Sequence, residues 1–209
     1  MNYLAAPVIF LFSYLLGSFP SGYLIGKFNG IDIRKHGSKN IGATNVRRTL
    51  GRDWGVICFI LDFLKGYLAV ILIGRTIGAH YPIGPGYGML IASVGSICGH
   101  VFPVWLKFKG GKGVATSLGV VVGISFLSFL IGGLTWLLLF HVKRIVSIAS
   151  MGAVIAMALA AALFQLFRWH AVGWPCVILF VVIAAVVIIR HKDNIIRLKN
   201  GTENAFKKP

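Results

Sequence analysis

Acidic residues are scarce in this sequence, and charged residues of either sign are few. Only 5 of the 209 residues are Asp or Glu, 12% are charged and 57% are hydrophobic. A soluble domain is nearer a quarter charged, so this composition excludes one and predicts an integral membrane protein. The apolar runs suit membrane helices rather than barrel strands. We therefore expect an all-α, polytopic fold that forms a single domain over residues 1–209.

Several chemical signatures are also missing. The acids are scattered, with no carboxylate pair and no cluster that has metal-ligand spacing. This disfavours a two-metal mechanism or a metal-dependent phosphatase, and we expect no metal and no cofactor. No His is followed five positions later by Asp, so the H-x4-D arrangement of many acyltransferases is absent. Cys58, Cys98 and Cys176 lie in or beside apolar segments, which indicates buried, inert thiols.

Six long apolar segments make up most of the chain. A membrane-spanning helix needs roughly 20 residues, and each segment is long enough, the last only just. The first segment lacks a basic start and a small-residue cleavage site, so we interpret it as a retained span rather than a signal peptide. The six segments cover residues 3–25, 54–73, 87–106, 114–140, 145–167 and 174–189.

The 21 Lys and Arg residues give the chain a net charge of +16. Nearly all of them lie in residues 27–52, 107–112, 143–144 and 190–208, whereas the linkers 74–86 and 168–173 hold one each. Because basic loops stay in the cytoplasm, we expect the stretches 27–52, 107–112 and 190–208 to lie inside. Basic groups in short loops between spans argue against a nucleic-acid partner. Anionic lipid head groups and an anionic substrate both remain as explanations.

The number of crossings creates a conflict with this charge pattern. Three apolar segments between Lys112 and Arg190 would place the basic tail outside the cell. Residues 114–140 are interrupted by Gly123, Ser125, Ser128 and Gly132–Gly133. The conflict disappears if they form two helices of about a dozen residues each, which return the chain to the cytoplasm at residues 141–144. The sequence then predicts seven transmembrane helices, the fourth and fifth short, with the N-terminus outside and the C-terminus cytoplasmic. The alternative is one bent span and an outside tail.

Residues 37–51 form the first of three polar clusters. This stretch combines glycines, hydroxyls, amides and cations, and it contains no acid. Arg47 and Arg48 can grip phosphate oxygens in pairs, so we expect an anion site here. A simpler alternative is that Ser38 or Thr44 caps a helix. Just upstream, Pro20 should break or kink the end of the first span. The short polar side chains of the cluster are Ser38, Asn40, Thr44 and Asn45.

Residues 99–113 form the second cluster, in which lysines surround a glycine turn that opens a new helix. Backbone N–H groups at a helix start, together with lysine, can cradle an anion. The turn is not a Walker A loop, because Gly113 follows Lys112 where Ser or Thr is required. An ordinary basic cytoplasmic turn is the alternative. The cluster contains Lys107, Lys109, Gly110, Gly111, Lys112 and Gly113.

The third cluster lies at the basic end of the last span. If that span continues as a helix, His191 and Asn194 share one face at a spacing of three residues. A stop-transfer tail is the alternative.

Two charges, Asp62 and Lys65, fall inside the second span, where unpaired charge is expensive. They either pair with each other or brace the floor of a site.

Three blocks of this sequence closely resemble the three cytoplasmic motifs of a known family. The blocks are residues 37–51, 99–116 and 190–203, and residues 17–22 and 62–66 match as well. The chain resembles the bacterial acyl-phosphate:glycerol-3-phosphate acyltransferases, the PlsY family, over nearly its whole length. The resemblance implies seven transmembrane helices in the bacterial cytoplasmic (inner) membrane. It also implies acyl transfer to the 1-hydroxyl of sn-glycerol 3-phosphate, without coenzyme A or acyl carrier protein as donor.

The resemblance also implies roles for individual residues. It associates the turn at Gly110–Gly113 with glycerol 3-phosphate binding, and it makes Glu203 structural. The implied catalytic residues are Ser38, Arg48, Lys112, His191 and Asn194. With the polar groups identified above, the phosphate-binding set is Asn40, Thr44, Asn45, Arg47, Lys107, Lys109, Gly110, Gly111 and Gly113.

These residue types suit a reaction between two phosphates. An acyl-phosphate is already activated, so proximity and charge stabilisation can carry most of the catalysis. Ser38 or Asn194 would stabilise the carbonyl oxygen, and Arg48 or Lys112 the leaving phosphate. The general base is either His191 or a substrate phosphate. A transporter of an organic phosphate is the rival function, but its binding groups should lie near the bilayer midplane rather than in loops at one face.

Overall fold

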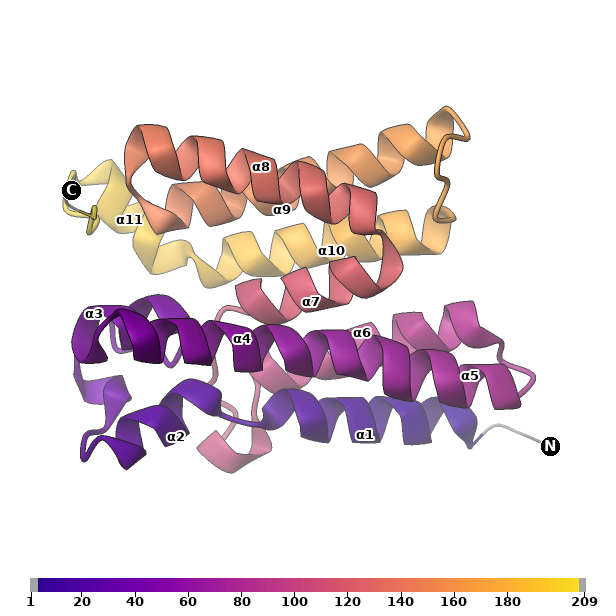
Figure 1. Cartoon of the computed structure of the whole chain (residues 1–209), viewed down its shortest axis with the longest axis horizontal. Helices are drawn as coiled ribbons and strands as arrows, with labels where there is room; N and C mark the ends of the chain where they lie inside the picture. Colours follow the sequence, from indigo (N-terminus) through magenta and orange to yellow (C-terminus); the bar gives the residue numbers. More distant parts are fainter. Residues whose placement is uncertain (1–3, 207–209) are drawn as a thin grey trace. The chain divides into compact units, whose positions relative to one another are not determined.

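The computed structural model describes residues 4–206, and every regular element within them is a helix (Figure 1). The chain divides into two compact units, unit 1 over residues 1–123 and unit 2 over residues 124–209. The predicted start of the first span at Tyr3 and the tail cations Lys207 and Lys208 lie outside the described residues.

Unit 1 begins with two helices that together cover most of the first predicted span, residues 3–25. The chain leaves α1 at Phe19, and Pro20, which has no backbone N–H, precedes the first residue of α2. The predicted break at Pro20 is therefore confirmed. The helices of unit 1 are α1 (Ala5–Ser18), α2 (Ser21–Phe28), η1 (Ile33–Lys35), α3 (Ala43–Leu50), α4 (Arg52–Leu68), the π-helical η2 (Ala69–Arg75), α5 (Thr76–His80), α6 (Pro85–Val101), η3 (Val104–Leu106) and α7 (Val114–Ile124).

Glycines bring the long helices of unit 1 into close contact. A Cβ atom added to Gly99 of α6 would overlap the carbonyl of Tyr14 on α1, and one added to Gly66 of α4 would overlap the carbonyl of Thr116 on α7. Small residues at such crossings let helix backbones approach closely in a membrane. As a result α6 is seated along α1, and the first turns of α7 are seated against α4.

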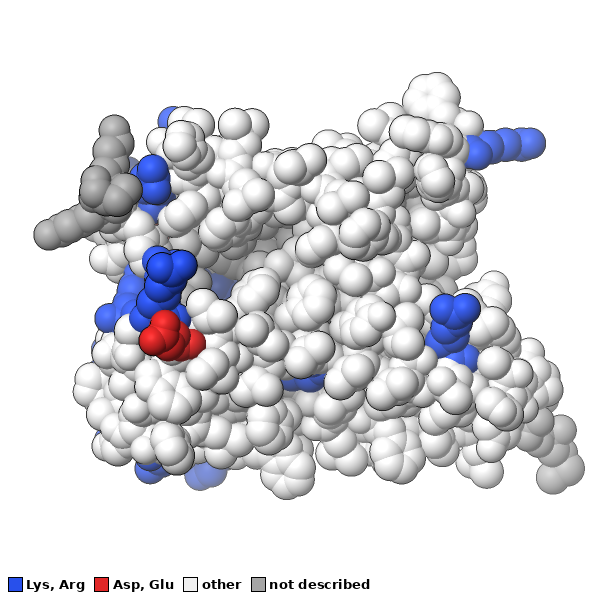
Figure 2. Space-filling view, viewed as in Figure 1, with Lys and Arg blue, Asp and Glu red and all other residues white. Residues whose placement is uncertain are grey.

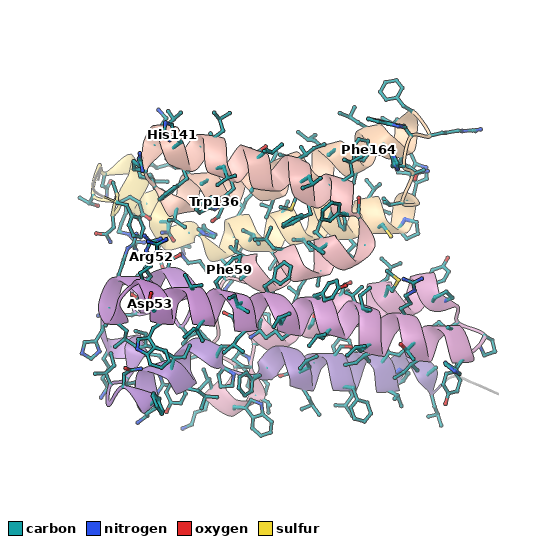
Figure 3. The ribbon with its side chains drawn as sticks, viewed as in Figure 1. Arg52, Asp53, Phe59, Trp136, His141 and Phe164 are labelled. Carbon is teal, nitrogen blue, oxygen red and sulfur yellow. The ribbon has the colours of Figure 1, made fainter. Side chains whose placement is uncertain are left out.

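Between residues 124 and 206, unit 2 has three long helices and one short one. They are α8 (Phe126–Lys143), α9 (Val146–Leu166), α10 (Trp174–Arg190) and α11 (Lys192–Lys199). The α8–α9 turn and α11 lie at one end of this unit, and the α9–α10 loop lies at the other (Figure 1). In Figure 3, Trp136 and His141 mark α8 as it approaches the first of these ends, and Phe164 marks α9 near the second.

The predicted break within residues 114–140 is confirmed, but one predicted length is wrong. Ser125 separates the two helices and caps α8 by accepting a hydrogen bond from the Ser128 backbone N–H. The fourth predicted helix is short, since α7 has 11 residues. The fifth is not, because α8 has 18 residues and continues through Gly132 and Gly133. Gly132 is a packing site for Met157 of α9, and a helical glycine costs only about 1 kcal/mol.

Length and composition support a polytopic membrane protein. Five helical stretches within residues 4–206 are long and apolar enough to cross a membrane, and a sixth exists if α10 and α11 count as one span. These two helices meet at an angle of 57° at His191. The sequence predicted a shared helix face for His191 and Asn194 only if the last span continues as a helix into the tail. The bend means that the span does not continue straight. Both side chains are nevertheless buried.

Candidate active site

One buried amide organises the first polar cluster. Asn45, on α3, is 1% exposed. Its Oδ1 accepts a hydrogen bond from the Ser38 backbone N–H at 2.7 Å, and its Nδ2 lies 2.8 Å from the carbonyl oxygen of Asn40. Nδ2 also lies 3.1 Å from the His36 carbonyl and 3.2 Å from the Ile33 carbonyl. Both polar atoms of the amide are thus occupied by the loop, so Asn45 shapes the loop that carries Ser38 instead of presenting its amide to phosphate.

The remaining polar residues of this cluster lie around the start of α3. The Asn40 Oδ1 atom accepts a hydrogen bond from the Gly42 N–H at 2.8 Å. Gly42 is the N-cap of α3, and no side chain caps this helix, so the alternative that Ser38 or Thr44 serves as its cap is wrong. Ser38, Thr44 and Arg48 are half-buried, whereas Arg47 is exposed.

Asp32 neutralises one cation at the base of this loop. Its carboxylate is 2.8 Å from the Arg34 guanidinium, which also lies over the ring of Tyr23 at 4.6 Å. The hydrogen bond from the Arg34 side chain lowers the pKa of Asp32, and the same bond raises the pKa of Arg34. Asp32 is therefore ionised at neutral pH and has its own counter-charge, so it does not oppose an anion elsewhere in the loop.

The second cluster is a turn bound back onto the end of α6. The Gly110 N–H donates to the Val101 carbonyl and the Gly111 N–H to the His100 carbonyl, both at 3.1 Å. Gly113 has φ of +83°, a left-handed conformation that favours glycine, and α7 begins directly after it. The predicted glycine turn that opens a helix is confirmed. Lys112 is half-buried in this turn, while Lys107 and Lys109 are exposed.

One hydrophobic cluster supports both of these segments within unit 1. It contains Ile33 and Ile41 from the first loop, Val46 from α3 and Leu106 from η3, packed with Ile25 and Cys58. The helices α2 and α3 and the start of α4, marked by Arg52 and Asp53, lie together at one end of this unit (Figures 1 and 3). In Figure 2, Lys and Arg side chains gather over this end of unit 1.

The third cluster, in unit 2, is held together by Glu203. Its Oε1 accepts hydrogen bonds from Asn194 Nδ2 at 2.5 Å and from Ser147 Oγ at 2.9 Å, and its Oε2 pairs with Arg197 at 2.7 Å. Burial alone would raise the pKa of Glu203, but the hydrogen bonds from Asn194, Arg197 and Ser147 outweigh it and lower that pKa. An ionised Glu203 thus ties α9, α11 and the tail together.

His191 is buried at the junction between α10 and α11. Its Nδ1 atom lies 2.7 Å from the Val187 carbonyl oxygen. A carbonyl can only accept a hydrogen bond, so Nδ1 must carry the hydrogen. In the neutral form of the ring, the lone pair is therefore on Nε2.

Sequence reasoning missed two residues around the charged pair in the second span. Asp62 and Lys65 are paired at 2.9 Å, as one of the alternatives predicts. Ser21 and His100 also face the Asp62 carboxylate. Both residues stand inside the blocks singled out above, but nothing local to either position indicates contact with a helix about 40 residues away.

The fold and these clusters define a polytopic membrane protein whose glycine- and cation-rich segments lie at the ends of its helices. Residues 7–201 match the family model described as glycerol-3-phosphate acyltransferase. The chain therefore belongs to the glycerol-3-phosphate acyltransferase family, PlsY, and is a membrane enzyme of that kind. This finding sets aside the transporter alternative.

Relatives of known name support this assignment over nearly the whole chain. The glycerol-3-phosphate acyltransferase of Aquifex aeolicus is 43% identical over 94% of this chain and 96% of its own length. That of Trichlorobacter lovleyi is 46% identical over 93% and 94%. A crystal structure of PlsY in its glycerol 3-phosphate form is 40% identical with a TM-score of 0.85, covering 97% of this chain and 96% of that one. The lysophosphatidic acid form gives a TM-score of 0.82 over 97% and 95%.

Proposed function

We propose that this enzyme transfers a fatty acyl group from an acyl-phosphate to the 1-hydroxyl of sn-glycerol 3-phosphate, which yields lysophosphatidate and inorganic phosphate. Neither coenzyme A nor acyl carrier protein serves as the donor. The observation that carries this proposal is the pair of glycine- and cation-rich segments that share one hydrophobic cluster in unit 1. Two segments of this kind suit two phosphate-bearing substrates.

The acids of the protein are arranged so that they do not oppose bound phosphate. Asp32 pairs with Arg34, Asp62 with Lys65, and Glu203 with Arg197. The other two acids, Asp53 and Asp193, are exposed in the first turns of α4 and α11. Paired carboxylates leave the net positive field of the loops available to anions.

The reaction needs no metal in this scheme. The 1-hydroxyl oxygen attacks the carbonyl carbon of the acyl-phosphate, the carbon–oxygen bond to phosphate breaks, and the hydroxyl proton passes to a base. Ser38 or Asn194 stabilises the carbonyl oxygen, while Arg48 or Lys112 stabilises the leaving phosphate. His191 or a substrate phosphate takes the proton. The contact between His191 Nδ1 and the Val187 carbonyl supports His191, because it fixes the orientation of the imidazole ring.

The other predicted residues have supporting parts in this scheme. Gly110 and Gly111 set the shape of the turn around Lys112, because their backbone N–H groups donate to the Val101 and His100 carbonyls. Asn45 likewise acts through the loop that it shapes. The proposed catalytic residues are spread from position 38 to position 194, and we propose that residues 1–209 form a single acyltransferase domain. The side chains proposed to contact substrate phosphate are Asn40, Thr44, Arg47, Lys107 and Lys109.

We also propose seven transmembrane helices, with the N-terminus outside, the C-terminus inside and the active site at the cytoplasmic face of the bacterial inner membrane. In unit 2, Lys143 and Arg144 lie at the same end as α11, while Arg168 lies at the other. This separation supports the proposal. In a cysteine-free variant, a cysteine at position 143 should react with an impermeant thiol reagent only from the cytoplasmic side. Periplasmic reaction would exclude this topology.

Purified protein supplied with acyl-phosphate and glycerol 3-phosphate tests the chemistry. We expect lysophosphatidate and phosphate in equal amounts. No lysophosphatidate should form when acyl-coenzyme A or acylated acyl carrier protein replaces the acyl-phosphate. Ser38→Ala and Arg48→Ala should each lose most of the activity, about 100-fold for a lost transition-state donor, while still inserting in the membrane. Asp53→Asn, at the exposed start of α4, is the matched control. Turnover near that of the unmodified protein in both variants would exclude the assigned roles.

A further inference from the structure

A cluster of buried polar side chains surrounds one carboxylate in the middle of unit 1. Asp62, on α4, is 2% exposed. Its Oδ1 atom lies 2.9 Å from Lys65 Nζ, 3.0 Å from Ser21 Oγ, which donates to it, and 3.6 Å from His100 Nδ1. Lys65 Nζ also donates to the Phe19 carbonyl at 2.8 Å. The carboxylate therefore joins α4 to the break between α1 and α2 and to the end of α6.

The His100 ring extends this cluster to the glycine turn. One side of the imidazole, at Nδ1, faces Asp62. The other side lies against Gly111, where an added Cβ atom would overlap His100 Nε2. The Gly111 N–H donates to the carbonyl of the same histidine. The position of the turn is thus set by the backbone and the ring of one residue, and that ring abuts the buried carboxylate.

The same cluster extends to the first polar loop. Cys58 Sγ lies 3.8 Å from Asp62 Oδ2 and 3.9 Å from the carbonyl oxygen of Ile41. A Cβ atom added to Gly22, next to Ser21, would overlap that same Ile41 carbonyl. Ile41 directly precedes Gly42, the N-cap of α3. Each of the two segments therefore contacts a residue that itself contacts Asp62. Ile41 of the first loop contacts Cys58, and Gly111 of the turn contacts His100.

Stability alone is a poor explanation for this arrangement. Removing two charges from water costs several kcal/mol per ion, and an apolar pair of similar size often stabilises a protein as well or better. What the pair supplies is directional contact: an ion pair and hydrogen bonds fix distances that apolar packing leaves adjustable.

We propose that Asp62, Lys65 and His100 are positioning residues that hold the Gly110–Gly113 turn at a set distance from the Ser38–Asn45 loop. They act through the turn and do not touch substrate. The inference rests on the proposed function, in that the turn with Lys112 is taken to bind the phosphate of glycerol 3-phosphate, and Arg48 is taken to bind the leaving phosphate of the acyl-phosphate. Misplacement of the turn should therefore weaken capture of this substrate and leave acyl-phosphate capture unchanged.

Two variants test the inference in the full-length enzyme. Asp62→Asn/Lys65→Met removes both charges together, so neither is left buried without its partner, and it keeps a side-chain oxygen for Ser21. His100→Leu removes the ring contact with Asp62 and Gly111. We expect each to raise KM for glycerol 3-phosphate about 10- to 100-fold with KM for acyl-phosphate unchanged. His100→Gln, which keeps polar atoms in the side chain, should restore part of the loss.

Matched controls come from the same unit. Asp53→Asn changes an exposed acid at the start of α4, and His80→Leu changes an exposed histidine at the end of α5; both should leave the two KM values unchanged. If His100→Leu does not accumulate in the membrane, the double variant and His100→Gln decide the question. An unchanged KM for glycerol 3-phosphate in the double variant, or equal losses for both substrates, overturns the inference.

Lys112→Ala separates this inference from the proposed function. If Lys112→Ala leaves the glycerol 3-phosphate KM unchanged, the turn does not bind that phosphate and the site assignment fails. If Lys112→Ala raises that KM but the double variant does not, the site assignment stands and only the positioning role is refuted.

Discussion

Replacing Asn45 with alanine tests whether this amide shapes the first loop or binds phosphate itself. The amide accepts one hydrogen bond from the Ser38 backbone, and its two hydrogens are shared among the carbonyls of Asn40, His36 and Ile33. At about 1 kcal/mol for each accepted or donated bond, the substitution removes about 3 kcal/mol. Because the bonds converge on a single loop, the loss falls on the segment that carries Ser38.

We expect Asn45→Ala to lower both stability and turnover. The midpoint of thermal unfolding of the purified enzyme should fall, and kcat should drop about 10- to 100-fold as Ser38 loses its fixed position. Asn29→Ala is the matched control, since the Asn29 side chain makes one hydrogen bond, to the Ile25 carbonyl in the same unit. It should change turnover little.

A different pattern would refute this reasoning. If Asn45 holds substrate phosphate directly, Asn45→Ala should raise KM for one substrate while the unfolding midpoint and kcat stay unchanged. That outcome would restore the role that the sequence predicts for Asn45 and would remove the structural role argued from its hydrogen bonds.

Two further predictions concern the glycine turn and the tail. Gly111→Ala should abolish most activity, because the added methyl group overlaps the His100 ring. Gly86→Ala is the control and should be tolerated, because nothing lies within reach of an added methyl group there. Equal activity of the two variants in the acyl-transfer assay would contradict the described packing. The pKa of Glu203 is lowered in the folded protein by hydrogen bonds from Asn194, Arg197 and Ser147 that outweigh burial. The stability it contributes is therefore present above its ordinary pKa and is lost as pH falls through the lowered value. Glu203→Gln should lower stability at neutral pH and flatten the acid limb of an unfolding profile measured against pH, and an unchanged acid limb would exclude this role.

The hydrophobic pattern alone predicted most of the helices. Residues in lipid must satisfy their backbone hydrogen bonds internally, so long apolar runs indicate spans directly, and the basic stretches between them indicate loops. A break within residues 114–140 followed from the charge of the tail together with the serines and glycines there, and the structure places it at Ser125. The three polar blocks also identified the family that the comparisons establish.

The length of α8 and the direction of the Asn45 side chain could not be predicted in this way. Gly132 looks like a helix breaker in the sequence, but in the fold it is a contact site for Met157 of α9. Asn45 looks like a phosphate ligand, but its position on α3 turns it toward the preceding loop. In each case the outcome depends on which neighbour a residue meets after the helices pack.

Residue types and their order therefore determined the class of protein, the membrane helices and the polar segments, because hydrophobicity and charge act on each segment independently. Tertiary structure alone decided that Asp62 meets Ser21 and His100, that Glu203 joins α9 to α11, and that the first loop and Leu106 share one core. These contacts join residues separated by tens of positions, and only the packing of the helices within each unit brings them within a few ångströms.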